Sequence, residues 1–417
     1  MKVFKFGGAS VKDYHGVINL FKVIKLLGVK KKLIVVSAMG KTTNAFEKVV
    51  DAYFNDLNQV NFFIDEIKKM HFNIIENLFK NIDDQVRFKV AEIFSKLDKF
   101  ISSNNNMDYS YVYDQIVSNG ELLSTIIIHN YLKNNGLKNC WLDSRICIKT
   151  DSYFRDSNLD WIETEKQIKK RVDKNSITIT QGFIGSDSKN NTTTLGREGS
   201  DYTAAIFAYA LDAKSVTIWK DVPGVLNGDP RIFDDLILLN KISYREAIEL
   251  AFYGASVIHP KTLQPLKRKE IPLFVKSFKD PLKDGTSVSK GISIDPNVPC
   301  YILKSNQVLL KMSSKDFSFI VEENISEIFS LLHKYQMKVE LIQNSAISFS
   351  VCVNNKYDRL EELISILKLK YELKVYKNVE LYTIRHFNKK SIKSLNKFKD
   401  KIILEQRTEK ILQVVKT

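Results

Sequence analysis

The stretch Thr193-Thr194-Leu195-Gly196-Arg197-Glu198-Gly199-Ser200-Asp201-Tyr202-Thr203 places glycines, a cation, carboxylates and hydroxyls between two apolar segments. Upstream, residues 176–185 are rich in β-branched side chains and end in glycines, which predicts a strand and a loop. Downstream, the apolar run at residues 204–211 predicts a buried helix. A strand, a glycine-rich loop and a helix start favour an anion site, because the first helical N–H groups are unpaired. The alternative is a polar turn in which Ser200 or Asp201 caps the helix.

Strand and helix patterns alternate on both sides of this stretch. Residues 3–6 and 31–37 are predicted strands, and the second contains the apolar run typical of a parallel strand covered on both faces. Residues 17–27 between them have the spacing of an amphipathic helix. This order predicts a doubly wound α/β sheet. Further strands are predicted at residues 216–219 and 271–276, and further helices from residue 118, at residues 243–250 and within residues 254–266.

Other segments depart from that alternation. Residues 44–103 have apolar side chains at helical spacing and no strand pattern, which predicts a helical insertion that covers the sheet. Residues 280–286 contain Pro and Gly between charged residues and indicate a linker. Beyond residue 300, short strands and helices alternate, which predicts two small α+β units, the second abbreviated. We therefore expect an α/β domain over residues 1–290 and the two small units over residues 300–417.

The composition argues against several classes of protein. The chain has 417 residues, 44% of them hydrophobic, and lacks an apolar run of membrane-spanning length, so we expect a globular protein. Its first residues lack the apolar core of a signal peptide, which favours the cytoplasm. The net charge of +15 comes from lysines spread along the chain, so no nucleic-acid partner is expected. The four cysteines and six histidines form no ligand pattern, so no metal ligands from the protein are predicted.

Five motifs follow one another along the α/β domain. They are Lys5-Phe6-Gly7-Gly8-Ala9-Ser10, Ser118-Asn119-Gly120-Glu121-Leu122-Leu123-Ser124, residues 194–201, Asp221-Val222-Pro223-Gly224 with Asp229-Pro230-Arg231, and Tyr253-Gly254-Ala255 with His259-Pro260. Together they resemble the motifs of aspartate kinases, in the amino-acid kinase family, and the tail resembles the tandem ACT regulatory domains of those enzymes. The resemblance implies a three-layer αβα amino-acid kinase fold with a mostly parallel sheet, followed by two ACT-like domains.

The resemblance also implies a reaction. It is the transfer of the γ-phosphoryl group of ATP, with Mg²⁺, to the β-carboxylate of L-aspartate, the first step towards lysine, threonine and methionine. The acceptor is already an anion and needs no general base, so the enzyme has to align two anions and reduce their repulsion.

Roles for individual residues follow from the resemblance. Lys5 and Asp201 are the expected catalytic residues, because Lys5 meets the developing phosphate charge and Asp201 orients Lys5. Glu121 suits the ammonium group of aspartate, and Arg197 suits its α-carboxylate in a bidentate fork. The remaining substrate contacts are assigned to Ser37, Thr43, Phe183 and Ser200. The nucleotide contacts are assigned to Lys5, Phe6, Gly7, Gly8, Ser10, Lys220, Asp221, Leu226, Arg231 and Ser256.

Several of these positions depart from the pattern of the family. Glu198 stands where a glycine is usual, and Leu226 where many members have a tyrosine near adenine. Ser256 replaces a lysine that contacts the nucleotide in some relatives. Lys220, in place of Thr or Ser, or Lys261 is expected to supply the missing cation.

The tail is expected to sense an amino acid. In lysine-sensitive relatives the effector segment matches residues 338–346, with contacts assigned here to Lys338, Val339, Glu340, Asn344 and Ser345. Glu340 matches one of two acids around the effector amine, but Ala346 stands where the second is expected. A partly buried ammonium group needs full charge compensation, so we expect weak inhibition by lysine, with threonine or no inhibitor as alternatives. We also expect a homodimer or higher homo-oligomer formed through the ACT-like domains.

Two other functions remain possible from the residues. One is another amino-acid kinase, such as glutamate or carbamate kinase, and the other is a non-catalytic amino-acid sensor built on the ACT-like tail. A bifunctional kinase with homoserine dehydrogenase is not expected, because the sequence contains no G-x-G-x-x-G dinucleotide motif.

Overall fold

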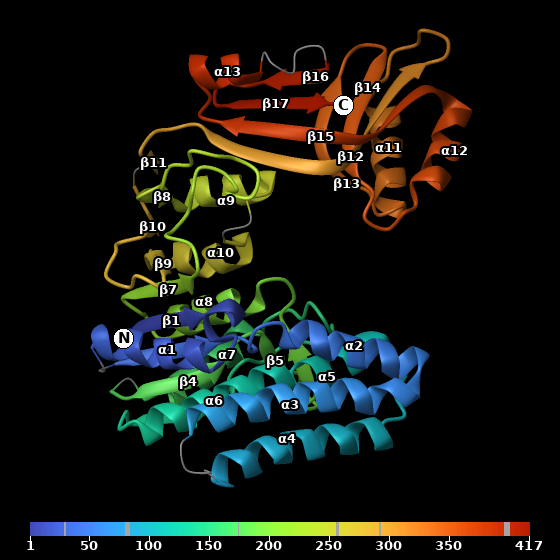
Figure 1. The fold of residues 1–417 in the computed structure, drawn as a ribbon. Coiled ribbons are helices and arrows are strands. Elements are labelled where there is room, and N and C mark those ends of the chain that lie inside the picture. Colours follow the sequence, from blue (N-terminus) through green and yellow to red (C-terminus); the bar gives the residue numbers. More distant parts are fainter. Residues whose placement is uncertain (29–30, 80–83, 174, 256–257, 292, 396–400) are drawn as a thin grey trace. The chain divides into compact units, whose positions relative to one another are not determined.

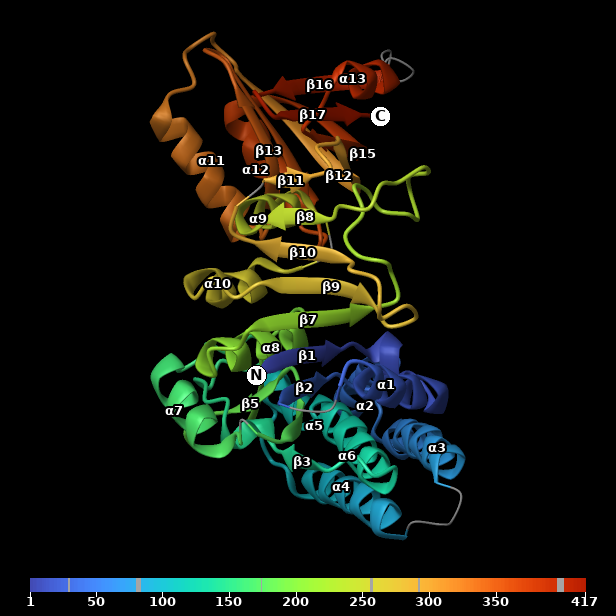
Figure 2. The same ribbon diagram turned by 90° about the vertical axis from the view of Figure 1, so that its left-hand side faces the viewer.

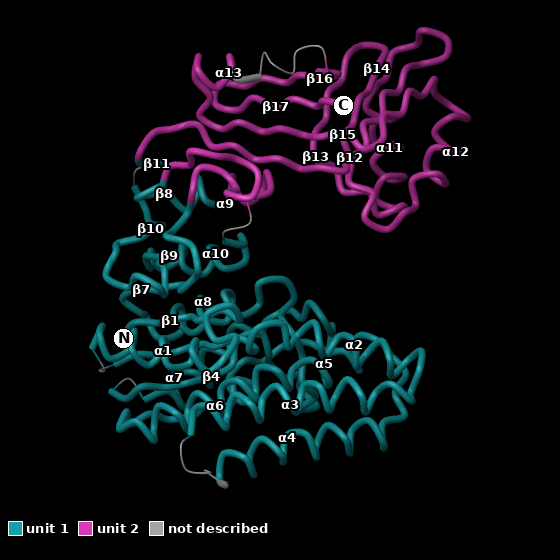
Figure 3. The backbone as a smooth tube through the Cα atoms, in the orientation of Figure 1, with its two compact units in different colours: residues 1–225, 238–248, 257–295 teal, residues 226–237, 249–256, 296–417 magenta. Residues whose placement is uncertain are grey.

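A computed structural model describes residues 1–28, 31–79, 84–173, 175–255, 258–291, 293–395 and 401–417 (Figure 1). The chain divides into two compact units (Figure 3). The first unit contains residues 1–225, 238–248 and 257–295, and the second contains residues 226–237, 249–256 and 296–417. Two short segments from the α/β region of the sequence thus group with the tail, and the division runs through one helix, α9 (Tyr244–Tyr253).

The first unit is built on a nine-stranded sheet with the order β11-β8-β10-β9-β7-β1-β2-β4-β3. From β9 to β3 each strand pairs in parallel with the next one in this order, and the described antiparallel pairs, β9 with β10 and β8 with β11, lie towards the β11 edge. This confirms the predicted doubly wound, mostly parallel sheet. The strands are β1 (Lys2–Phe6), β2 (Lys32–Val36), β3 (Asn139–Leu142), β4 (Ile177–Gln181), β7 (Ser215–Lys220), β8 (Lys241–Ser243), β9 (Leu273–Ser277), β10 (Thr286–Ser289) and β11 (Ile294–Asp295).

The sheet edges differ from the prediction. Residues 271–276 were expected to form the last strand of the domain, but β10 and β11 follow β9 and extend the sheet. The opposite edge is β3, which has no apolar alternation in its sequence. Both edges consist of short strands whose position depends on pairing with a neighbour, so the local pattern carries little information about them.

Helices cover both faces of this sheet. One face packs its apolar side chains against α1, and α6 also contacts β2, β3 and β4. On the other face α8 contacts β1, β2 and β7, and α7 and α10 pack against α8. Figure 2 shows α7 and α8 on one side of β1 and α1 on the other. The helices are α1 (Tyr14–Leu26), α2 (Thr42–Asn55), α3 (Val60–Leu78), α4 (Asp84–Ser103), α5 (Tyr109–Val117), α6 (Asn119–Asn134), α7 (Trp161–Arg171), α8 (Gly199–Ala210) and α10 (Pro260–Arg268).

The connection from β4 to α8 is longer than a simple loop. It contains a hairpin of two short buried strands, β5 (Ile184–Ser186) and β6 (Thr192–Thr194). The residue before α8 is Glu198, with a left-handed backbone at φ 53°. The alternative in which Ser200 or Asp201 caps the helix is therefore wrong, because both residues lie inside its first turn.

The second unit contains a six-stranded antiparallel sheet with the order β13-β14-β12-β15-β17-β16. Its sheet and helices agree with the expected ACT-like architecture. The two expected units share one sheet, because β12 and β15 pair with each other over almost their whole lengths, with a register shift near Gln307. The elements are β12 (Cys300–Ser314), α11 (Glu322–Lys334), β13 (Lys338–Asn344), β14 (Ser348–Asn354), α12 (Leu360–Lys370), β15 (Tyr371–Arg385), α13 (Lys389–Leu395), β16 (Ile402–Arg407) and β17 (Ile411–Lys416).

Across the described residues, every helix is too short or too polar to traverse a lipid bilayer.

Candidate active site

The site forms where α8 crosses β1. Lys5 lies near the carboxyl end of β1, and Asp201 lies in the first turn of α8. The Lys5 Nζ and Asp201 Oδ1 atoms are 2.5 Å apart, and the two side chains are 11% and 3% exposed. The partly positive start of the helix favours a carboxylate at this position. The predicted catalytic pair therefore comes together as a largely buried ion pair.

The glycines after β1 bring two loops close together. A Cβ atom on Gly8 would lie 2.8 Å from the Gly40 carbonyl oxygen, and the Gly40 N–H donates to the Gly8 carbonyl at 3.1 Å. A Cβ atom on Gly7 would lie 3.3 Å from Lys5 Nζ. The absence of side chains leaves the Lys5 ammonium group open on this side, as close approach of a phosphate requires.

Glu121 lies in the first turn of α6 and is 3% exposed. Its Oε1 atom accepts a hydrogen bond from the Ala38 N–H at 3.2 Å, and its Oε2 atom is buried without a partner among the described residues. Burial raises the pKa of Glu121 to about 8, and the Lys5 charge opposes this shift. Glu121 is thus not a solvated surface acid. It is a buried carboxyl group whose pKa is influenced by the Lys5 charge.

The other predicted ligand of aspartate, Arg197, is exposed at the loop before α8. It forms no ion pair within the described part of the chain.

Ser200 is 8% exposed, and its Cβ atom would lie 2.4 Å from a Cβ placed on Gly182. Phe183 has a left-handed backbone at φ 70°, and its N–H donates to Thr203 Oγ1 at 2.9 Å. The end of β4 is therefore held against the start of α8.

Ser37 and Thr43 follow the carboxyl end of β2, the strand beside β1. Both side chains are half-buried. The Ser37 N–H donates to the Phe6 carbonyl at 3.1 Å, which fixes the loop at the same edge of the sheet as Lys5. This is the edge at which parallel α/β sheets bind ligands.

The predicted nucleotide contacts in the first unit have different environments. Phe6 is fully buried and stacks on Trp219, with ring centroids 5.9 Å apart, so only its backbone is available to a ligand. Ser10 is buried, and its hydroxyl donates to the Trp219 carbonyl at 3.2 Å. Lys220 is half-buried at the end of β7, and Asp221 after it is exposed.

The remaining predicted nucleotide contacts are not among the described residues of the first unit. Leu226 and Arg231 belong to the second unit. Arg231 is exposed and forms an ion pair with Asp229, with Nη2 and Oδ2 2.6 Å apart. Ser256 lies outside the described residues.

Glu198, which stands beside Arg197 where a glycine is usual, contacts the segment before α10. Its Oε2 atom accepts a hydrogen bond from the His259 N–H at 2.9 Å, just before α10. Its left-handed φ of 53° explains why a glycine suits this position in other members. Lys261, the other candidate cation, is engaged with Asp156, with Nζ and Oδ1 2.5 Å apart.

Asp114, which supports the site from α5, is not among the site residues predicted from the sequence. It is fully buried and accepts hydrogen bonds from the Arg155 N–H at 3.0 Å, the Thr194 N–H at 2.8 Å and the Thr194 hydroxyl at 2.7 Å. Burial raises its pKa to about 6 despite these donors. A single acid in a helical segment gives no local signal of this role.

Asp114→Ala is expected to lower the free energy of unfolding by about 2–4 kcal/mol, because it leaves buried donors on β6 and near residue 155 unpaired. Urea denaturation followed by fluorescence measures the change. Asp98→Ala, which removes a half-exposed carboxylate on α4, is the matched control and should change stability by less than about 0.5 kcal/mol. Equal effects of the two substitutions would contradict the structural role of Asp114.

Known proteins share this fold and part of this sequence. Residues 1–277 match the amino acid kinase family. Lysine-sensitive aspartokinase 3 of Escherichia coli (strain K12) is 33% identical over 362 residues, which cover 84% of this chain and 78% of that protein. Crystal structures of E. coli aspartokinase III with lysine and aspartate, and with aspartate and ADP, match at TM-scores of 0.82 and 28% identity. They are matched over 100% of this chain and over 95% and 96% of their own chains. The chain therefore belongs to the amino acid kinase family and, within it, to the aspartokinases.

Proposed function

We propose that the protein transfers the γ-phosphoryl group of ATP to the β-carboxylate of L-aspartate and releases ADP and 4-phospho-L-aspartate. We place this reaction at the start of a route to lysine, threonine and methionine. The observation that carries the proposal is the Lys5–Asp201 ion pair beside Gly7, at the carboxyl edge of the sheet. The E. coli relative has been crystallised with aspartate and ADP, which supports the same substrates here.

The residues present suit the chemistry of two reacting anions. The β-carboxylate of aspartate attacks without losing a proton, so the barrier depends on alignment and on charge at the transferred group. Lys5 supplies a cation there, and Asp201 holds that cation in place at 2.5 Å. Arg197 and Glu121 are proposed to hold the α-carboxylate and the ammonium group, so that the β-carboxylate faces the nucleotide.

The site fits a nucleotide better than a metal ion held by the protein alone. The side-chain-free surface of Gly7 next to Lys5 suits a phosphate group. The described residues contain no group of three or more potential metal ligands. Mg²⁺ usually binds through one or two carboxylates and the phosphates of the nucleotide, and Asp221 is an exposed carboxylate at the end of β7. Mg²⁺ bound with ATP would neutralise part of the phosphate charge.

A hydroxylamine trap tests the proposal directly. The protein is incubated with ATP, Mg²⁺ and L-aspartate, and the acyl phosphate is converted to a coloured hydroxamate. We expect hydroxamate from L-aspartate and none from L-glutamate or from N-acetyl-L-aspartate, which lacks the ammonium group. Product from glutamate alone would indicate another amino-acid kinase, and no product from any acid would indicate a non-catalytic sensor.

The Michaelis constant for aspartate is expected to fall as the pH rises from about 6.5 to about 8.5, because Glu121 must lose its proton to bind an ammonium group. In the free protein its pKa is raised from 4.5 to about 8. Between pH 4.5 and about 8 the folded state therefore holds a proton that the unfolded state releases, and Glu121 makes the protein less stable as the pH rises through that range. Initial rates across the pH range measure the effect.

Glu121→Gln serves as the control for this pH dependence. We expect a higher Michaelis constant for aspartate in this variant. That constant should no longer fall through the titration of Glu121, and the Michaelis constant for ATP at each pH should stay as in the wild type. A Michaelis constant for aspartate that falls equally with pH in both proteins would assign the titration to another group.

We propose that the second unit senses an amino acid and that lysine inhibits weakly. The E. coli relative has been crystallised with lysine, and Glu340 is the expected acidic contact. In this chain the Glu340 side chain is 5% exposed and is paired with Lys304 and, at 2.9 Å, with Lys338. An incoming lysine ammonium group would have to compete with two cations of the protein. Val339, Asn344 and Ser345 remain proposed contacts on or beside β13, and the unit is also the proposed homo-oligomer interface.

Lys304→Gln is expected to lower the lysine concentration for half-inhibition about fivefold, since removing one competing cation changes binding by about 1 kcal/mol. Lysine and threonine are titrated separately in the hydroxamate assay. Lys377→Gln, which removes a cation paired with Glu361 in the same unit, should leave the titrations unchanged. If neither amino acid inhibits any of the three proteins, the unit is not a sensor of these effectors.

A further inference from the structure

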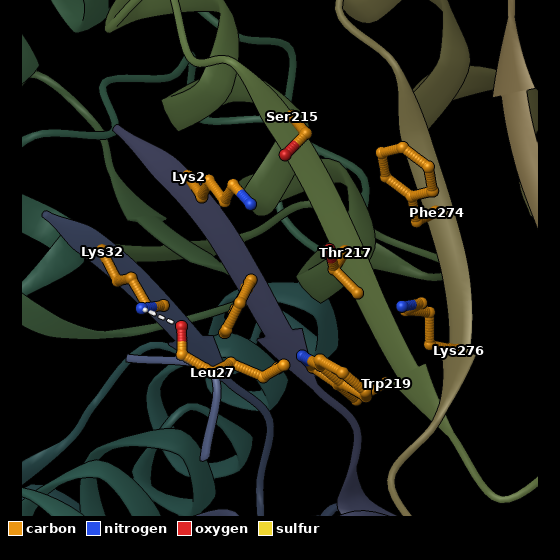
Figure 4. Close-up of a pocket in the computed structure, with 9 residues that line it drawn as sticks. Lys2, Leu27, Lys32, Ser215, Thr217, Trp219, Phe274 and Lys276 are labelled. Atoms are coloured by element: carbon orange, nitrogen blue, oxygen red, sulfur yellow. Dashed lines mark hydrogen bonds between the residues drawn. The ribbon is translucent and has the colours of Figure 1, made fainter. Parts of the chain in front are cut away.

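A cavity of about 190 Å³ lies on the face of the main sheet that carries Phe4 (Figure 4). Cations and aromatic rings dominate its lining: Lys2, Lys32 and Lys276 with Phe4, Trp219 and Phe274. Lys2 and Lys32 are the first residues of β1 and β2, whereas Lys5 lies near the carboxyl end of β1. The cavity is therefore distinct from the candidate active site.

The lysines of this cavity have no acidic partner in the part of the chain that the structure describes. Lys2 and Lys32 are directly paired in the parallel register of β1 and β2, and like charges placed opposite each other on a sheet are destabilising. Lys32 is 4% exposed and donates to the carbonyls of Leu27 and Gly28. Burial, and then the Lys2 charge, lower its pKa. Within the described residues, none of Lys2, Lys32 and Lys276 forms an ion pair.

Trp219 provides a second, independent observation. Its side chain is 1% exposed, and its indole Nε1 atom is buried without a hydrogen-bond partner among the described residues. Stacking on Phe6 at an interplanar angle of 13° fixes the ring. Figure 4 draws the indole nitrogen at the end of the ring directed towards Leu27 and Lys32. A buried donor without an acceptor is unfavourable by about 1–3 kcal/mol, and an anionic oxygen in the cavity would supply the acceptor.

The surface beside the cavity is also rich in lysines. Lys276 projects from β9 towards Thr217 of β7 in Figure 4. A neighbouring hollow of about 590 Å³ shares Lys2 and Lys32 with the cavity and adds Lys31 and Lys214. Among the described residues, neither lining contains an acidic side chain. A cavity of roughly 150 Å³ holds a benzene ring, so a ligand with one ring and one acidic group fits.

We propose that this cavity binds a small organic anion, with a carboxylate or phosphate among Lys2, Lys32 and Lys276 and a flat apolar body against Phe4 and Trp219. The anion would neutralise Lys2 and Lys32 and accept a hydrogen bond from the indole N–H of Trp219. Charge-assisted hydrogen bonds of this kind are stronger than neutral ones.

Fluorine NMR of the full chain tests the proposal with three probes. Para-fluorobenzoate and para-fluorophenyl phosphate are the anions, and para-fluorobenzylamine has the same ring with a positive charge. We expect the protein to broaden the fluorine signals of the anions at millimolar concentration and to leave that of the cation sharp. Saturating L-aspartate and ADP should not reverse the broadening, because the cavity is separate from the candidate active site.

Substitutions locate the bound probe. Lys276 lies on β9 and its side chain is half-buried. Lys276→Met should weaken binding of the anions at least about tenfold. Lys32→Met should do the same, and thermal unfolding identifies any loss of folding. Lys22→Met removes an exposed charge from α1 outside the cavity and should have no effect. Equal broadening of the cation, displacement by aspartate and ADP, or unchanged binding in Lys276→Met would each overturn the proposal.

Discussion

Lys5→Ala is expected to lower kcat by about two to three orders of magnitude and to change the Michaelis constant for aspartate much less. The Lys5 ammonium group is held 2.5 Å from Asp201 and faces the open surface of Gly7. A preorganised cation there acts mainly on the charge that develops during transfer, so its loss raises the barrier by about 3 kcal/mol. Initial rates in the hydroxamate assay, with both substrates varied, separate kcat from the Michaelis constants.

Two variants make this result specific. Asp201→Asn keeps the shape of the side chain but removes the charge that orients Lys5, so kcat should also fall. Lys22→Ala removes an exposed lysine of α1 and should retain the rate of the wild type. If Lys5→Ala kept a turnover within about threefold of the wild type, far from the roughly hundredfold loss expected, Lys5 would not be catalytic.

Arg197→Ala should raise the Michaelis constant for aspartate by about two orders of magnitude, because a bidentate contact to a carboxylate is among the strongest in proteins. Arg197 is exposed beside α8 and has no ion pair among the described residues, so its guanidinium group is available to a ligand. The Michaelis constant for ATP should remain as in the wild type. Steady-state kinetics with each substrate varied in turn measures both constants.

The conservative substitution separates charge from geometry. Arg197→Lys keeps the charge but loses the planar fork, so it should restore only part of the affinity. Arg171→Ala, at the exposed end of α7, is the control for removing an arginine of the same unit. An unchanged Michaelis constant for aspartate in Arg197→Ala would remove Arg197 from the proposed substrate site.

Local patterns in the sequence determined the core of the architecture. All residues of β2 and β4 are buried, so their apolar and β-branched runs identified them without knowledge of their neighbours. The helices α3 and α4 bury one stripe each, and the matching spacing was visible in residues 44–103. The glycine motifs identified the loops after β1 and before α8, because only particular residues suit such close backbone contacts.

The tertiary structure decided what depends on residues distant in the chain. The position of Glu121 in a predicted helix does not show whether its side chain is exposed, and only the packing of α6 against the loop at Ala38 buries it. Asp114 has no local signal, because its partners lie on β6 and near residue 155. The strands β12 and β15 merge two expected units into one sheet through pairing that neither segment encodes alone. The burial of Glu121 and Asp114 and the pairing of β12 with β15 depend on contacts between distant segments. Local periodicity shows only which face of a helix or strand is buried.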